Sequence, residues 1–155
     1  MPWRVADILP RVALALLVSL ALIAPAAAGE AINTTDENVA IKGYDTVAYF
    51  VEDRPMKGKP EFEHVWQGAR WQFATPEHRD MFAADPLRYA PRYGGFCSGG
   101  MSLGVKATIN PEAWAIIDGK LYLAFSERTM KRFVSDPDRS IAEANANWER
   151  LGEVE

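Results

Sequence analysis

Cysteine and histidine are scarce in this chain, which limits the sites that it can build. Its 155 residues include one cysteine, Cys97, and two histidines, His64 and His78. One cysteine cannot close an internal disulfide, so Cys97 is either buried, bound to a ligand or free to pair between molecules. Neither histidine has a second His, Asp or Cys at zinc-ligand spacing, and the Gly-x-Ser-x-Gly motif of a serine hydrolase does not occur. The sequence therefore predicts neither a zinc motif nor a nucleophile elbow.

Positive charge is also in short supply. Lysine and arginine total 17 against 21 aspartates and glutamates, which gives a formal net charge of −4. Proteins that bind nucleic acids usually gather an excess of basic residues on one face. We therefore expect no nucleic-acid partner.

Only one long apolar run occurs, over residues 12–23. It follows Arg4 and Arg11 and leads to small residues that end at Ala28, an arrangement typical of a secretory signal peptide. The run is shorter than the roughly 20 residues that a membrane-spanning helix needs. We predict a signal peptide over 1–28, cleavage after Ala28, no stable membrane span afterwards, and a periplasmic or secreted protein.

The remaining sequence contains a pattern that repeats after 51 residues. Each copy reads as a hairpin, a helix cap, a short helix and an Asp-Pro stop, and a match at fixed spacing indicates repeated units. The predicted hairpin turns are Gln67-Gly68 and Asp118-Gly119, and the predicted caps are Thr75 and Ser126. The identical pairs are Gly68 with Gly119, Phe82 with Phe133, Asp85 with Asp136, and Pro86 with Pro137. We predict a flexible leader over 29–38 and one domain over 39–155. The predicted fold class is α+β, with small antiparallel strands in two hairpin–helix units, produced by internal duplication and covered by three helices.

Three further expectations concern local structure. Residues 39–50 read as extended, apart from a break at 43–45. Residues 137–151 read as the longest helix, because apolar residues recur on one face. The stretch 94–104 holds five of the eleven glycines and predicts a tightly turning loop that joins the two units. If the units are duplicates, Phe82 and Phe133 should both be buried.

Cys97 and Met101, both in the glycine-rich stretch, are the first candidates for a functional site. Thiolate and thioether sulfur are soft ligands that suit Cu(I). Alternatively, Cys97 is a small buried apolar residue and Met101 covers the core. A third reading makes Cys97 a nucleophile paired with a histidine, with main-chain N–H groups of the glycines stabilising an oxyanion.

Several segments resemble the YHS domain family, and more closely its exported, stand-alone members. The matching segments are 43–50, 71–75, 82–89, 93–97, 118–123 and 147–148. The resemblance implies a YHS-type domain, similar to a metal-binding module of heavy-metal pumps and sensors. The ligand positions of that module fall on Ala48, Ala74 and His78 of this chain, so only His78 is retained as a ligand. It follows that a metal site would have to be rebuilt, with Cys97, His78 and Met101 as its candidates.

We therefore expect an exported, non-catalytic protein that binds a soft metal such as copper, or a small ligand. One alternative is a structural or protein-interaction module, which predicts an exposed apolar patch near residues 94–103. The other is a thiol enzyme, which predicts rapid alkylation of Cys97 in the native protein.

Overall fold

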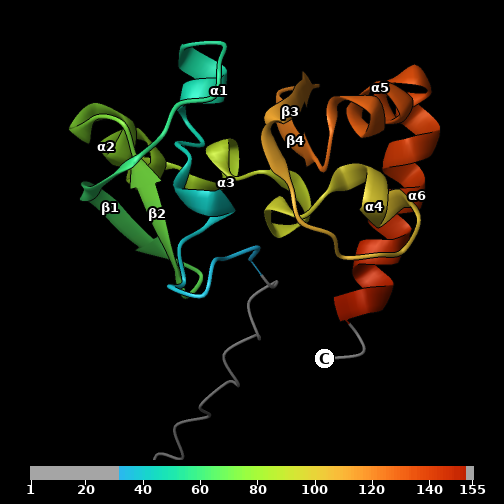
Figure 1. The fold of residues 1–155 in the computed structure, drawn as a ribbon, viewed down its shortest axis with the longest axis horizontal. Coiled ribbons are helices and arrows are strands. Elements are labelled where there is room, and N and C mark those ends of the chain that lie inside the picture. Colours follow the sequence, from blue (N-terminus) through green and yellow to red (C-terminus); the bar gives the residue numbers. More distant parts are fainter. Residues whose placement is uncertain (1–31, 153–155) are drawn as a thin grey trace, which may run out of the picture.

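The computed structural model describes residues 32–152, which form an α+β fold of two antiparallel two-stranded sheets and six α-helices (Figure 1). The predicted fold class is therefore confirmed. The predicted signal peptide, residues 1–28, lies outside the described residues. In chain order the elements are η1 (Ile41–Gly43), α1 (Ala48–Val51), β1 (Lys59–Trp66), β2 (Ala69–Phe73), α2 (Pro76–Ala84), α3 (Pro86–Tyr89), η2 (Arg92–Gly95), α4 (Ser98–Ser102), β3 (Asn110–Ile117), β4 (Lys120–Ala124), α5 (Glu127–Ser135) and α6 (Pro137–Gly152).

The two hairpin–helix units have the same geometry at a constant offset. The elements β3, β4 and α5 of the second unit begin and end 51 residues after β1, β2 and α2 of the first. Lys59 pairs with Phe73, and Asn110 pairs with Ala124; in each hairpin the register shifts directly after this pair. Figure 1 places the first unit in one half of the molecule and the second unit, with α4 and α6, in the other.

Each hairpin closes through two residues with left-handed backbone. The φ angles are 48° at Gln67 and 73° at Gly68 in the first turn, and 49° at Asp118 and 70° at Gly119 in the second. Positive φ at both central residues characterises the type I′ turn, whose twist matches that of the flanking strands. Both turns lie where the sequence predicts them.

The helices of the two units begin at the predicted caps. The Thr75 hydroxyl accepts the N–H of His78 at 3.1 Å, and the Ser126 hydroxyl accepts the N–H of Thr129 at 3.2 Å. Each cap provides an acceptor for one of the N–H groups that the first turn of a helix leaves without a partner. Both helices stop at an aspartate that precedes a proline.

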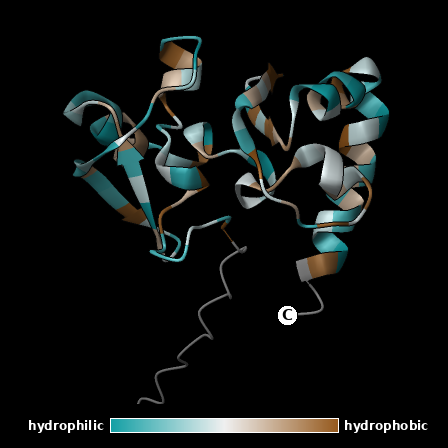
Figure 2. Cartoon of the chain, in the orientation of Figure 1, coloured by the Kyte–Doolittle hydropathy of each residue, from teal (hydrophilic) through white to brown (hydrophobic). Residues whose placement is uncertain are grey.

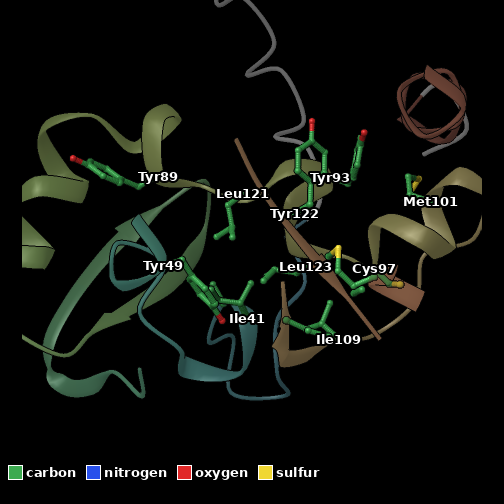
Figure 3. Close-up of a cluster of buried hydrophobic side chains, with 14 of the residues drawn as sticks. Ile41, Tyr49, Tyr89, Tyr93, Cys97, Met101, Ile109, Leu121, Tyr122 and Leu123 are labelled. Carbon is green, nitrogen blue, oxygen red and sulfur yellow. The ribbon is translucent and has the colours of Figure 1, made fainter. Parts of the chain in front are cut away.

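The core contains equivalent aromatic pairs from the two units. Phe82 stacks on Trp71 with ring centroids 5.1 Å apart, and Phe133 lies 5.4 Å from Tyr122. Phe82 is 0% exposed and Phe133 is 1% exposed, which confirms that both are buried. Cys97 lies in the same core, among buried side chains that include Leu123 (Figure 3).

The longest helix, α6, is amphipathic as expected. Ala144 is fully buried, and the partly buried Ile141, Trp148 and Leu151 pack against the core. Figure 2 shows polar and apolar residues alternating along this helix. None of the helices within residues 32–152 combines the length and the apolar character needed to cross a bilayer.

Two short segments differ from the sequence prediction. Residues 48–50, which read as extended, belong to α1, because the side chain of Asp45 accepts the N–H groups of Val47 and Ala48 and starts a helical turn. The glycine-rich stretch is not a simple loop, since it contains the end of η2 and the whole of α4. A Cβ on Gly99 would lie 2.4 Å from the methyl group of Thr129, so glycine lets α4 pack closely against α5.

Residues 32–38, the described part of the predicted flexible leader, form hydrogen bonds with other parts of the chain. The main-chain N–H of Asn33 donates to the Gly94 carbonyl at 2.8 Å, and its side chain donates to the Gly95 carbonyl at 3.0 Å. The Asn38 side chain donates to the Gly68 carbonyl at 2.7 Å. Residues 32–38 are therefore attached to the first hairpin turn and to the segment that links the two units.

Candidate functional site

A buried carboxylate organises the first unit. Asp45 is 0% exposed; its Oδ1 accepts the N–H groups of Val47 at 2.9 Å and Ala48 at 3.2 Å. Its Oδ2 accepts the N–H of Ala74 at 2.8 Å and lies 2.6 Å from Nδ1 of His78. Asp45 therefore connects the start of α1, the end of β2 and the helix α2.

The thiol of Cys97 takes the corresponding place in the second unit. Its Sγ accepts the N–H of Gly100 at 3.3 Å and the N–H of Phe125 at 3.2 Å. Phe125 follows Ala74 by 51 residues, and Gly100 stands three residues after Cys97 as Ala48 stands three after Asp45. Thus the same two main-chain donors hold a carboxylate in one unit and a thiol in the other.

A main-chain bond confirms this equivalence. The N–H of Asp45 donates to the Met56 carbonyl, and the N–H of Cys97 donates to the Ala107 carbonyl, each at 2.9 Å. The acceptors are 51 residues apart, whereas Asp45 and Cys97 are 52 apart, so the segment from Cys97 to its acceptor is one residue shorter than the segment from Asp45 to its acceptor.

The two sites differ in the side chain beside the acceptor. His78 of the first unit is replaced by Thr129 in the second, whose hydroxyl lies 3.0 Å from that of Ser126. The imidazole covers Asp45, and its Nε2 lies 4.0 Å from Glu52. The first site is therefore closed by its own histidine, and the second has no such ring.

An open pocket of about 700 Å³ borders Cys97. It lies between α4, α5 and the start of α6. Its most deeply buried residues are Cys97 and Phe133, each 1% exposed. The lining residues are Cys97, Gly99, Gly100, Ser102, Leu103, Ala107, Phe125, Arg128, Thr129, Arg132, Phe133, Ser135, Asp136, Arg139, Ser140 and Glu143.

The charged residues of this pocket leave two guanidinium groups available. Arg139 Nε lies 2.9 Å from Glu143 Oε1, and this hydrogen bond raises the pKa of Arg139. Within residues 32–152, neither Arg128 nor Arg132 is paired with a carboxylate. The pocket wall thus favours an anionic group, although the chain as a whole is acidic.

The structure does not gather the three candidate metal ligands in one place. His78, on α2, and Cys97, just before α4, lie in opposite halves of the molecule (Figure 1). Met101 is fully buried and is not among the residues that line the Cys97 pocket. In the described part of the chain, no group of three or more His, Cys, Asp or Glu residues is arranged to hold a metal ion.

The positions that the YHS resemblance points to do lie together. Ala48, Ala74 and His78 all contact the carboxylate of Asp45. Sequence reasoning missed Asp45 itself, because a single aspartate in an apolar segment gives no sign that it will be buried. The repeat could have drawn attention to it, since Asp45 and Cys97 each follow a left-handed turn that contains glycine.

Comparison of the chain with family models, curated proteins and solved structures finds no match. Membership of the YHS family therefore stays a prediction from the sequence motifs.

Proposed function

We propose that this chain is an exported, non-catalytic binding protein of the YHS type, whose small ligand occupies the pocket over Cys97. The observation that carries the proposal is the contrast between the two units. The same main-chain donors hold an acceptor in each, but the first acceptor is covered by His78 and the second borders an open pocket.

The lining indicates an anion with an apolar part. Arg128 and Arg132 can hold a carboxylate, sulfonate or phosphate, since guanidinium groups form paired hydrogen bonds to such oxygens. Leu103 is 74% exposed and Phe125 is 58% exposed, and both line the pocket. Small-molecule sites commonly combine apolar walls with a few polar groups in this way.

Binding is favoured over thiol catalysis by the positions of the histidines. A cysteine nucleophile needs a base within hydrogen-bond distance. His78 is engaged with Asp45, and the ring of His64 packs against Phe82 with centroids 6.1 Å apart, both in the first unit.

The aromatic anion 8-anilinonaphthalene-1-sulfonate is a suitable probe. We expect saturable binding to one site on the native protein, measured by fluorescence and calorimetry. Arg132→Gln should weaken binding roughly tenfold, the loss expected for one charge-assisted contact. Lys131→Gln, the same charge change at a neighbouring exposed position outside the pocket, should have no effect.

Cys97 provides the second arm of this experiment. Because the thiol borders the pocket but is 1% exposed, iodoacetamide should modify it slowly in the native protein, unlike the rapid alkylation that a thiol enzyme predicts, and the adduct should then block the probe. A thiol that reacts only after unfolding would contradict the proposal. So would probe binding whose affinity is changed neither by the adduct nor by Arg132→Gln.

Copper binding is a separate proposal that the same thiol allows. An anaerobic Cu(I) titration against a competing chelator, run beside Cys97→Ser and His78→Ala, tests it directly. Stoichiometric binding lost in Cys97→Ser would support a soft-metal site. Binding by the wild-type chain that is no tighter than binding by Cys97→Ser would exclude Cys97 as a ligand.

Exposed apolar residues favour a protein-interaction module as the second candidate. Leu103 and Val105 are 74% and 55% exposed and follow α4 directly, at the place where the sequence predicts an exposed apolar patch. If this face binds a second copy of the chain, sedimentation should show an association that Leu103→Ser weakens. A monomer at all concentrations would exclude self-association.

A further inference from the structure

A second and smaller cavity lies where the two units meet. Its volume is about 150 Å³, and it is bordered by the first hairpin turn, the linker between the units, the start of β4 and α6. Its lining residues are Ile32, Trp66, Gln67, Leu87, Arg88, Ala90, Pro91, Arg92, Tyr93, Gly94, Lys120 and Trp148. The cavity shares none of its lining residues with the pocket over Cys97.

The cavity is lined by cations and by no carboxylate. Arg88 and Arg92 belong to the linker between the units, and Lys120 begins β4. Within residues 32–152, none of these three side chains forms an ion pair with an acidic residue. Three uncompensated positive charges around one small cavity repel each other, so an anion would stabilise them.

One nitrogen of the Arg92 side chain lacks an acceptor. Its Nε is buried and has no hydrogen-bond partner in the described structure. A buried N–H without an acceptor is costly, and such groups normally bind water or a ligand.

Both guanidinium groups are also held in place by aromatic rings. Arg92 lies over the ring of Tyr93 at 5.7 Å from its centroid, and Arg88 lies over the ring of Tyr89 at 5.4 Å. The Tyr93 hydroxyl donates to Asn145 at 3.0 Å, which fixes that ring against α6. Stacking reduces the conformational freedom that an arginine loses when it binds an anion.

The geometry points to an oxyanion site between the two units, which takes a phosphate-sized group. At about 30 Å³ per water molecule, the cavity has room for roughly five heavy atoms, the number in a tetrahedral oxyanion. Planar guanidinium groups suit its oxygens, and Lys120 adds a third donor. The group is either free inorganic phosphate or the end of an aromatic phosphomonoester, because Trp66 and Trp148 provide apolar walls.

Calorimetry with inorganic phosphate and with phenyl phosphate, at matched ionic strength, tests this site. We expect saturable binding of at least one of them with a dissociation constant of roughly 1 mM or tighter. Tighter binding of phenyl phosphate would identify an organic phosphomonoester as the source, and equal binding would identify free phosphate. Because two indoles line the cavity, tryptophan fluorescence should change over the same concentration range.

Variants separate this site from general electrostatic attraction. Arg92→Gln should weaken phosphate binding at least roughly tenfold, because it removes a charge-assisted contact. Lys120→Gln is the second variant, since Lys120 is exposed and its replacement leaves the core intact. Lys131→Gln, an equal charge change away from the cavity, is the control. No saturable binding of either phosphate, or equal weakening in all three variants, would overturn the proposal.

Discussion

Replacing Asp45 by asparagine tests whether a buried carboxylate holds the first unit together. The residue is fully buried, and its two oxygens accept three main-chain N–H groups and contact His78. These partners belong to α1, to the end of β2 and to α2. Asparagine has nearly the same shape, so the substitution changes hydrogen bonding and charge but hardly affects packing.

The cost follows from the number of acceptors that are lost. An asparagine side chain offers one oxygen and one NH₂ group, whereas an ionised aspartate accepts at both oxygens. Whichever way the amide of Asp45→Asn turns, its NH₂ group faces a buried main-chain N–H that has lost its acceptor. An unsatisfied buried donor costs about 1–3 kcal/mol, and losing the charge from the remaining bonds costs about 1 kcal/mol more. We expect the free energy of unfolding to fall by about 2–4 kcal/mol.

Equilibrium unfolding in urea measures this change. The midpoint for Asp45→Asn should fall by roughly 1–2 M with an unchanged slope, because the unfolded surface is the same. Asp85→Asn is the matched control: Asp85 is exposed and caps α3 by accepting the N–H of Arg88 at 3.3 Å. Asparagine caps helices as well as aspartate does, so the control should change stability by less than about 0.5 kcal/mol. Equal effects of the two substitutions would refute the reasoning.

Two further predictions concern the repeat and the alkaline limit of stability. Phe82→Ala and Phe133→Ala should each lower the free energy of unfolding, measured in urea, by about 3–5 kcal/mol, because each removes a fully buried ring from an equivalent place. A small effect of either substitution would show that the two units contribute unequally to stability. Burial, with a smaller contribution from Tyr122, raises the pKa of Tyr93 to about 12. The unfolded chain ionises this tyrosine near pH 10, so its contribution to stability is complete below that pH and is lost as the pH rises towards about 12. Between about pH 10 and pH 12, the free energy of unfolding of Tyr93→Phe should therefore fall less steeply than that of the wild type. The two slopes should differ by up to about 1.4 kcal/mol per pH unit. Parallel slopes for the variant and the wild type would contradict this.

Local signals account for the parts of the fold that sequence reasoning predicted. The turns at Gln67-Gly68 and Asp118-Gly119, and the caps Thr75 and Ser126, act over two to four residues. Their effects do not depend on distant parts of the chain. The hairpins and the helices α2 and α5 therefore lie close to their predicted positions.

The short helices α1 and α4 depend on contacts that are distant in sequence. Asp45 starts α1 and also binds Ala74, 29 residues away; Cys97 precedes α4 and binds Phe125, 28 residues away. In the sequence, residues 48–51 are apolar and aromatic, which favours a strand, and the glycines of α4 disfavour a helix. Tertiary packing overrides both preferences.

The candidate site was predicted only in part. The sequence points to Cys97 because it is the only cysteine, and it links the ligand role of Cys97 to His78 and Met101. The structure places His78 beside Asp45 and gives Cys97 a pocket that includes Arg128 and Arg132. Residues from α4, α5 and α6 meet there, and no spacing in the sequence indicates that meeting.

The sequence by itself determined the α+β class, the two hairpin–helix units and the burial of Phe82 and Phe133, because the repeat and the turn and cap residues are local signals. The tertiary structure alone decided that Asp45 and Cys97 occupy equivalent places, and that only the first is covered by a histidine. The physical reason is that an acceptor, its main-chain donors and the side chain that covers it come from separate segments. Only packing of the complete domain brings those segments within hydrogen-bond distance.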